Sequence, residues 1–354
     1  MSALPPKIRV LVVDDSALAR RSISDALSRD PAIAVVGFAA DPYIARERIL
    51  ELEPDVITLD MEMPRMDGLT FLRILQEHHP VPVVVVSSLT QAGSELALQA
   101  LEAGAIEVLA KPNGSTSIGE IARQLIHGVK AAARSQGRAA RALKAAAPTA
   151  PAALPYAGDA THQRLLLIGA STGGVEALRY LLPQLPANVP PIVVVQHIPA
   201  NFSRIMAAHL DALCRFTVRE ASDGEELRSG VCLIAPGGFH AVISATGRGY
   251  RVRLTQTPPV HYCRPSVDVL FRSGAEAAGP NVVAALLTGM GSDGARGLQL
   301  LRSRGARTLA EAEESCVVFG MPQAAIKLGA AEQVVPLQRM PQAILRALTE
   351  VPQP

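Results

Sequence analysis

Residues 8–21, IRVLVVDDSALARR, join six mostly apolar residues to two aspartates and then to an amphipathic stretch. The same order recurs along the first third of the chain. We predict strands at Ile8–Val13, Ala34–Phe38, Val56–Leu59, Val83–Val86 and Ile106–Leu109, and helices near 17–29, 43–52, 67–77, 93–102 and 118–134. Apolar strands that alternate with helices indicate a parallel sheet covered on both faces, and such sheets bind ligands at the carboxyl ends of their strands.

Five polar residues follow the predicted strands at that edge of the sheet: Asp14, Asp15, Asp60, Ser87 and Lys111. Three clustered carboxylates repel one another unless a cation neutralises them. A lysine or a hard ion such as Mg²⁺, which prefers oxygen ligands, could do so. Each aspartate alone is more simply a helix cap or a solvated loop residue, but the five together indicate a binding site.

The segment 128–160 is rich in alanine with scattered Lys and Arg, and it carries prolines at 148, 151 and 155. Alanine and arginine can extend the preceding helix, whereas the proline-spaced second half favours an extended, mobile conformation. We therefore predict domains at 1–127 and 161–354, joined by a linker at 128–160. The first domain has 11 basic and 17 acidic residues, the linker 5 and 1, and the second domain 18 and 14.

The second domain repeats the alternation of strands and helices. Its predicted strands are Leu165–Ile168, Ile192–Val195, Val231–Ala235, Val282–Leu287 and Thr308–Ala310, and its helices lie near 175–182, 202–213, 266–278, 294–304 and 322–328. The stretch 215–262 is more irregular and is expected to include an antiparallel hairpin around Arg248–Leu254. A second doubly wound α/β domain is the prediction.

The first strand of this domain runs into GASTGG at 169–174, which matches the G-x-S-x-G pattern of an exposed nucleophilic serine, here Ser171. Such a turn could equally hold a dinucleotide pyrophosphate or carry no chemistry. A dinucleotide site favours an acid after the next strand, but His197 stands there. Asp293 follows a third strand and could orient that imidazole, although alone it could be only a helix N-cap.

An α/β-hydrolase would require the chain order serine, acid, histidine. The candidates for that order are Asp211 or Asp223, followed by His240 or His261. None of these four lies at the end of a predicted parallel strand. Chain order therefore favours Ser171, His197 and Asp293 on a different doubly wound sheet, since catalytic triads are recognised by geometry rather than by order.

Residues 6–127 resemble the receiver domain of two-component response regulators, a flavodoxin-like, doubly wound, five-stranded parallel sheet. The resemblance rests on LVVDDSALARR at 11–21, LDMEMPRMDGL at 59–69, VSS at 86–88 and Lys-Pro at 111–112. One departure is Val108, which stands three residues before the lysine, where many receivers carry a switching Tyr or Phe.

The receiver resemblance implies that Asp60 accepts a phosphoryl group from a histidine kinase. It implies a set of Mg²⁺ ligands made of Asp14, Asp15, Asp60 and the backbone carbonyl of Glu62. Ser87 would hydrogen-bond the phosphoryl group, and Lys111 would pair with its charge.

Residues 163–350 resemble the catalytic domain of the CheB family, chemotaxis response regulators that act as protein-glutamate methylesterases. The resemblance rests on IGASTGG at 168–174, QHIP at 196–199, IAPGG at 234–238 and LTGMGSDGARG at 287–297. It implies the following roles: Ser171 as nucleophile, His197 as general base and later acid, Asp293 as its orienting carboxylate, the Met290 amide in the oxyanion hole, and Thr172 close to the nucleophile.

The CheB resemblance also implies the reaction and the partners. Methyl esters of glutamate on methyl-accepting chemotaxis receptors would be hydrolysed to release methanol, and receptor glutamines would be deamidated. The ester chemistry would need no cofactor, and a chemotaxis histidine kinase would be the phosphodonor. Phosphorylation of Asp60 is expected to release the active site from the receiver.

The composition narrows the function classes further. A net charge of +2 and an aromatic content of 3% give no argument for nucleic-acid binding. No signal segment and no run of about 20 apolar residues is present, so we expect a cytoplasmic protein that is not membrane-embedded. Four cysteines without a CxxC pattern predict reduced, buried thiols.

Two alternatives to the esterase come from other classes of protein. A response-regulator transcription factor would need a compact basic helix-turn-helix in place of the long second domain, which has strands. A catalytically inactive scaffold would bind receptor or kinase through the same surfaces. The presence of every proposed catalytic residue argues against the scaffold.

Overall fold

A computed structural model describes residues 6–87, 91–111, 118–135, 164–200 and 202–350. The chain divides into two compact units, Met1–Arg141 and Ala142–Pro354. The predicted linker begins within helix α5 (Ile118–Arg134), and its residues from 136 onward lie outside the described residues. No helix in the described ranges is both long enough and apolar enough to cross a bilayer.

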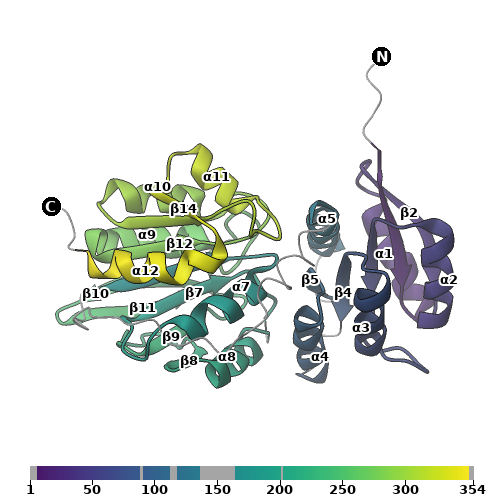
Figure 1. Ribbon diagram of the computed structural model, residues 1–354, viewed down its shortest axis with the longest axis horizontal. Helices are drawn as coiled ribbons and strands as arrows, with labels where there is room; N and C mark the ends of the chain where they lie inside the picture. Colours follow the sequence, from purple (N-terminus) through teal and green to yellow (C-terminus); the bar gives the residue numbers. More distant parts are fainter. Residues whose placement is uncertain (1–5, 88–90, 112–117, 136–163, 201, 351–354) are drawn as a thin grey trace, which may run out of the picture. The chain divides into compact units, whose positions relative to one another are not determined.

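The first unit, which we call the receiver unit, contains a five-stranded parallel sheet with the order β2-β1-β3-β4-β5 (Figure 1). Its strands are β1 (Ile8–Val13), β2 (Ile33–Ala39), β3 (Val56–Leu59), β4 (Val83–Ser87) and β5 (Glu107–Ala110). Its helices are α1 (Ala17–Leu27), α2 (Pro42–Leu52), α3 (Gly68–His78), α4 (Gln91–Glu102) and α5. This is the flavodoxin-like order, as predicted.

Strands β3 and β4 are buried at every position, including side chains that point to opposite faces of the sheet. Both faces are therefore covered, which explains why these strands read as continuous apolar runs. Val108 of β5 is also buried. It pairs in register with Val85 of β4, so the position where many receivers have an aromatic residue is part of the core here.

The second unit, which we call the catalytic unit, contains a seven-stranded parallel sheet with the order β14-β13-β12-β6-β7-β9-β8. Its strands are β6 (Leu165–Ala170), β7 (Ile192–Gln196), β8 (Thr217–Glu220), β9 (Val231–Ile234), β12 (Val282–Leu286), β13 (Arg307–Glu311) and β14 (Gln333–Val335). Its helices are α7 (Gly174–Leu181), α8 (Phe202–Leu213), α9 (Val267–Ala277), α10 (Ala295–Ser303), α11 (Met321–Lys327) and α12 (Met340–Thr349). The doubly wound α/β prediction is confirmed.

The predicted hairpin is present as the antiparallel pair β10 (His240–Thr246) and β11 (Gly249–Thr255). Two strands, β8 and β14, and one α-helix, α12, were not predicted from the sequence. Strands β8 and β14 are short edge strands with exposed positions between their buried or half-buried ones, so they lack the apolar run of a central strand.

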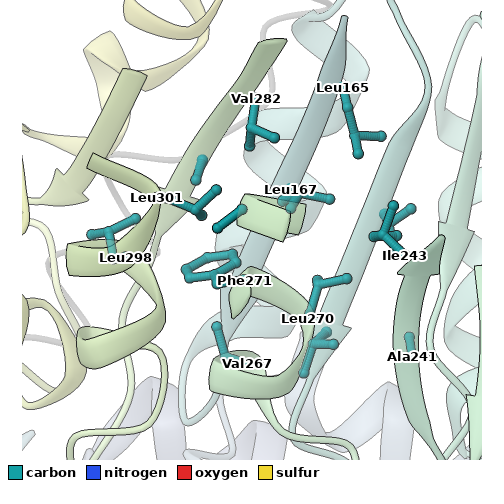
Figure 2. Close-up of a cluster of buried hydrophobic side chains, with 14 of the residues drawn as sticks. Leu165, Leu167, Ala241, Ile243, Val267, Leu270, Phe271, Val282, Leu298 and Leu301 are labelled. Atoms are coloured by element: carbon teal, nitrogen blue, oxygen red, sulfur yellow. The ribbon is translucent and has the colours of Figure 1, made fainter. Parts of the chain in front are cut away.

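Helix α9 packs onto the sheet next to α10 through a buried cluster of side chains (Figure 2). Phe271 of α9 lies among Leu167 of β6 and Leu298 and Leu301 of α10, and all four are fully buried. Burial of each such side chain stabilises the fold by about 1.5–3 kcal/mol. The cluster fixes the position of α9, whose first turn contributes to the site described next.

Candidate active site

The three central strands of the catalytic unit bring its predicted site residues to one edge of the sheet. Strand β6 pairs with β12 on one side and with β7 on the other. Ser171 directly follows β6, His197 directly follows β7, and the loop after β12 carries Asp293. Because all three strands are parallel, their carboxyl ends lie side by side, where loops of an α/β sheet form binding sites.

The side chains of these three residues form a continuous chain of contacts. His197 Nδ1 lies 3.1 Å from Ser171 Oγ, and His197 Nε2 lies 2.8 Å from Asp293 Oδ2. The imidazole therefore faces the serine with one nitrogen and the carboxylate with the other. This is the mutual geometry of a nucleophile, a base and a group that orients the base.

Asp293 is buried, and its carboxylate accepts hydrogen bonds from five donors. Besides the His197 ring, they are the Ser266 hydroxyl and the backbone N–H groups of Val267, Asp268 and Gly294, at 2.7–3.0 Å. Val267 and Asp268 form the first turn of α9, so Asp293 caps α9; it does not cap α10, whose N-cap residue is Gly294.

These donors outweigh the cost of burying the Asp293 carboxylate. Desolvation acts to raise its pKa, but the hydrogen bond and charge of His197, the Asp268 N–H and the Ser266 hydroxyl lower the pKa to about 2. Asp293 is therefore ionised at neutral pH. Its charge and fixed position favour the tautomer in which His197 carries its proton on Nε2.

His197 is largely buried, which by itself would lower its pKa. The neighbouring Cys263 and the Asp293 carboxylate act in the opposite direction and hold the pKa of His197 well above 6.5. The neutral imidazole is the form that can accept a serine proton. Deprotonation of His197 therefore precedes any attack by Ser171.

The loop after β12 also lies against the serine. A Cβ atom at Gly289 would lie 2.7 Å from Ser171 Cβ, closer than real Cβ contacts, so only glycine permits this approach. Met290, whose amide is predicted to contribute to the oxyanion hole, directly follows Gly289 in this loop. Thr172, the other residue predicted near the nucleophile, is buried, and its carbonyl accepts a hydrogen bond from the Thr288 hydroxyl at 3.0 Å.

Thr288 and Glu311 support this loop, and the sequence analysis missed both. The Thr288 carbonyl accepts the Ser171 N–H at 3.0 Å, and the Thr288 N–H donates to the Glu311 carboxylate at 2.8 Å. Glu311 ends β13 and is fully buried; it also accepts the Ser315 hydroxyl at 2.9 Å. Burial raises the pKa of Glu311 to about 7 against the lowering effect of these hydrogen bonds.

Gln196, which precedes His197, links the ends of strands β6 and β7 through hydrogen bonds. Its side-chain amide donates to the Ser171 carbonyl at 2.8 Å and to the His197 carbonyl at 3.1 Å. The sequence pattern contained this glutamine, but only the pairing of β6 with β7 shows which carbonyls it reaches.

The four residues considered for the α/β-hydrolase order of serine, acid and histidine form other contacts. Asp211 accepts the Val218 N–H, Asp223 pairs with Arg253, His240 accepts the Ser266 N–H, and His261 pairs with Asp268. None of these four contacts involves Ser171. The geometry thus favours the chain order Ser171, His197, Asp293, as the sequence analysis did.

The predicted acidic pocket of the receiver unit is also assembled. Carboxylate oxygens of Asp14, Asp15 and Asp60 lie within 4.8 Å of one another. Lys111 Nζ lies 3.1 Å from Asp14 Oδ2 and 2.6 Å from Asp60 Oδ2. Asp14 and Asp60 are buried, whereas Asp15 is exposed.

Two further predicted residues lie beside this pocket. Ser87 is buried at the end of β4, and its carbonyl accepts the Lys111 N–H at 2.8 Å. The Glu62 N–H lies 3.3 Å from Asp60 Oδ1. The backbone of residue 62 is therefore next to the aspartate that the resemblance singles out.

The donor set of this pocket fits a hard cation. Asp14 Oδ2 and Asp60 Oδ2 are buried, and they share a single ammonium group, that of Lys111. Burial raises the pKa of Asp60, although Lys111 opposes the shift, and contact with Asp60 and Asp14 raises the pKa of Lys111 against the effect of its own burial. Oxygen atoms left short of donors are the ligands that Mg²⁺ prefers.

Comparison with known proteins agrees with this fold. The CheB methylesterase family model matches residues 166–344, and the response regulator receiver domain model matches residues 10–123. Among solved structures, the Thermotoga maritima CheB methylesterase catalytic domain is 40% identical, with a TM-score of 0.51, over 52% of this chain and 97% of that chain.

Relatives match over almost their full length. The chain is 52% identical to a protein-glutamate methylesterase/protein-glutamine glutaminase of Anaeromyxobacter dehalogenans over 96% of each protein. It is 45% identical to one of Syntrophus aciditrophicus over 96% of this chain and 99% of the relative. A receiver unit and an α/β unit with a Ser-His-Asp site define a response regulator with a hydrolase output. The chain belongs to the CheB methylesterase family.

Proposed function

We propose that this chain is a phosphorylation-regulated serine hydrolase of chemotaxis adaptation. It demethylates glutamate methyl esters and deamidates glutamines on chemoreceptors, the pair of activities that its relatives carry in their names. The single observation that carries the proposal is the contact chain from Ser171 Oγ through the His197 ring to the Asp293 carboxylate.

The reaction begins when neutral His197 accepts the Ser171 proton at Nδ1 while Ser171 Oγ attacks the ester carbonyl. Asp293 stabilises the imidazolium that forms, because its ionised carboxylate is fixed at Nε2. The Met290 N–H stabilises the oxyanion of the tetrahedral intermediate in this proposal, an effect worth about 10²–10³ in rate for each donor.

The second half of the reaction returns the enzyme to its starting state. His197 donates its proton to the leaving methoxide, and methanol departs from the acyl-enzyme. A water molecule then loses a proton to His197 and attacks the acyl carbonyl. His197 returns that proton to Ser171 Oγ as the second tetrahedral intermediate collapses, which frees the glutamate carboxylate and the serine hydroxyl. Deamidation follows the same steps with ammonia as the leaving group and needs no cofactor.

The receiver unit supplies the regulation in this proposal. The Asp60 carboxylate attacks phosphorus of the phosphohistidine in a chemotaxis histidine kinase. Lys111 pairs with the charge of the new phosphoryl group and Ser87 hydrogen-bonds it. Asp14, Asp15, Asp60 and the Glu62 carbonyl would hold Mg²⁺, which offsets negative charge during the transfer.

The partners follow from this chemistry. The substrate is the cytoplasmic part of a methyl-accepting receptor, and the phosphodonor is the kinase of the same chemosensory system. We place the protein in the cytoplasm, where both would be present, with no role for nucleic acid.

The test of the hydrolase is methanol release from methylated receptor membranes. Ser171→Ala should lower kcat by about 10⁴-fold or more, because the hydroxyl that attacks the ester carbonyl is lost. Ser303→Ala, which removes an exposed hydroxyl at the end of α10, is the matched control and should retain wild-type release. Equal release by Ser171→Ala and wild type would refute the serine mechanism, and no release by wild type would favour the scaffold.

The test of the regulation is stimulation by a small phosphodonor with Mg²⁺. Asp60→Asn should lose all of the stimulation and retain basal methanol release. Asp67→Asn is the control, because Asp67 caps α3 in the same unit. Stimulation of Asp60→Asn to the wild-type level would remove Asp60 as the phosphorylation site.

A further inference from the structure

We infer that Cys263 is a second nucleophile of the active site, and that its reversible modification by disulfide-type reagents blocks the esterase. Cys263 Sγ lies 3.6 Å from His197 Nδ1, the same ring nitrogen that lies 3.1 Å from Ser171 Oγ. The His197–Asp293 pair therefore faces both a hydroxyl and a thiol. A thiol beside a histidine that a carboxylate orients is the arrangement that activates a cysteine.

A tight turn of the backbone fixes the position of this thiol. Val260 and Cys263 exchange both of their backbone hydrogen bonds, at 3.1 and 2.9 Å. The two residues between them have left-handed φ angles, 52° for His261 and 62° for Tyr262, which side chains other than glycine rarely adopt. Strained backbone of this kind is concentrated at functional sites.

Contacts on both sides of the turn support this conformation. His261 Nε2 lies 3.1 Å from Asp268 Oδ2 in the first turn of α9. Arg264 donates to the carbonyls of Gln256 and Thr257 at 3.1 and 3.2 Å. The sulfur of Cys263 is thus held at the imidazole by the fold rather than by a flexible loop.

The other three cysteines have different surroundings. Cys232 and Cys316 are buried, whereas Cys214 and Cys263 are half-buried, which corrects the expectation of four buried thiols. Burial, and then the Asp211 carboxylate, raise the pKa of Cys214 to about 12, so its thiolate is scarce. Cys263, in contrast, lies in contact with a histidine. Cys263 also acts to raise the pKa of His197, which agrees with this pairing.

The modification step balances as a thiol–disulfide exchange. His197 Nδ1 takes the Cys263 proton, and the thiolate attacks one sulfur of a low-molecular-weight disulfide or of a methanethiosulfonate. A new S–S bond forms while the second sulfur leaves as a thiolate or a sulfinate. The added group then occupies the space at Nδ1 that Ser171 needs. A dithiol reverses the step and releases Cys263.

The effect on activity rests on the proposed role of His197, but the reactivity of Cys263 does not. Methyl methanethiosulfonate is the probe, applied to the full chain, and mass spectrometry of peptides locates the modified cysteine. We expect Cys263 to be modified before the other cysteines. Esterase activity should fall at least tenfold as Cys263 is modified, and dithiothreitol should restore the activity. Cys214→Ala should behave as wild type.

Three variants distinguish the possible outcomes. The esterase activity of Cys263→Ser should be the same before and after treatment with methyl methanethiosulfonate. Inactivation of this variant at the wild-type rate would overturn the proposal. His197→Gln should slow modification of Cys263 at least tenfold, whereas Ser171→Ala should not slow it. Equal rates in His197→Gln and wild type would show that the imidazole does not activate the thiol. Absence of esterase activity in untreated wild type would refute the proposed function while leaving the modification rates measurable.

Discussion

Two buried aspartates, Asp293 in the catalytic unit and Asp60 in the receiver unit, have opposite surroundings. Asp293 accepts five hydrogen bonds, which hold its pKa at about 2 despite burial. Burial raises the pKa of Asp60, because Lys111 and one backbone N–H only partly offset it. A carboxylate saturated with donors can orient a neighbour but has no free oxygen. One left short of donors can bind a cation or attack an electrophile.

Glu311 is a third buried carboxylate, and it resembles Asp60 rather than Asp293. It is as buried as Asp293, but it accepts the Thr288 N–H and the Ser315 hydroxyl and forms no ion pair with a described residue. Its pKa is raised to about 7. Of these three carboxylates, the one with five donors has a lowered pKa, and the two with fewer donors have raised pKa values. The number of donors therefore governs how stable the negative charge is.

The largest effect is expected for Asp293→Asn. The amide cannot stabilise the imidazolium as the carboxylate does and favours the wrong tautomer of His197, so kcat should fall by about 10⁴-fold. Asp211→Asn, which changes an aspartate that accepts one backbone N–H elsewhere in the unit, should change kcat little. A fall of less than tenfold in methanol release by Asp293→Asn would contradict its role as the orienting group.

Glu311→Gln should reveal the cost of a buried charge with too few donors. The folded pKa of about 7 lies above the ordinary 4.5, so the stability that Glu311 contributes is full below pH 4.5 and is lost as the pH rises through 7. Relative to Glu311→Gln, wild type should lose up to about 3 kcal/mol of unfolding free energy across that window. Denaturant unfolding at pH 4.5 and 8 measures it.

The control for that experiment is Glu314→Gln, since Glu314 is exposed three residues away. The unfolding free energy of Glu314→Gln should change between pH 4.5 and pH 8 as that of wild type does. A constant difference between wild type and Glu311→Gln from pH 4.5 to 8 would mean that Glu311 does not titrate in this range.

Lys111→Met should leave the acidic pocket without its ammonium group. The carboxylates of Asp14 and Asp60 would then repel without compensation, so local stability of the receiver sheet should fall by about 1–3 kcal/mol. Added Mg²⁺ should recover more stability in this variant than in wild type. Hydrogen exchange of β1 and β3 amides in the full chain is the measurement.

Lys130→Met provides the comparison, because Lys130 forms an ion pair with Asp30 outside the pocket. Loss of this ion pair should lower the stability by less than about 1 kcal/mol. Added Mg²⁺ should stabilise Lys130→Met no more than it stabilises wild type. If Mg²⁺ protects Lys111→Met and Lys130→Met alike, the pocket does not act as the cation site.

The smallest effect is expected for Ser266→Ala, which removes one of the five donors to Asp293. Loss of one hydrogen bond to a charged group costs about 1.5 kcal/mol, so kcat should fall by about tenfold. The remaining donors keep the carboxylate in place. A fall as large as that of Asp293→Asn would show that the hydroxyl, rather than the whole set of donors, holds Asp293.

Much of the fold and part of the site follow from local sequence patterns. The apolar strands of both sheets were predicted to within about two residues at their ends, because parallel strands buried on both faces have no polar alternation to obscure them. Ser171, His197 and Asp293 were found since each follows such a strand. Edge strands β8 and β14 were missed because their exposed positions dilute that pattern.

The surroundings of Glu311 and Cys263 could not be predicted from the sequence. A glutamate that ends a strand normally faces solvent, and only the packing of β13 beside β12 shows that Glu311 is buried against Thr288. A lone cysteine 66 residues from His197 carries no signal of its own, and the left-handed turn that brings it to the imidazole is not encoded by glycines.

The sequence by itself determined which residues carry polar groups at strand ends, because strand and turn preferences act over a few neighbouring residues. Only the tertiary structure decided how many donors each carboxylate receives. That number depends on elements distant in the chain, such as the first turn of α9 against Asp293 and Lys111 against Asp60. The charge state of each group, and hence its chemistry, follows from those long-range contacts.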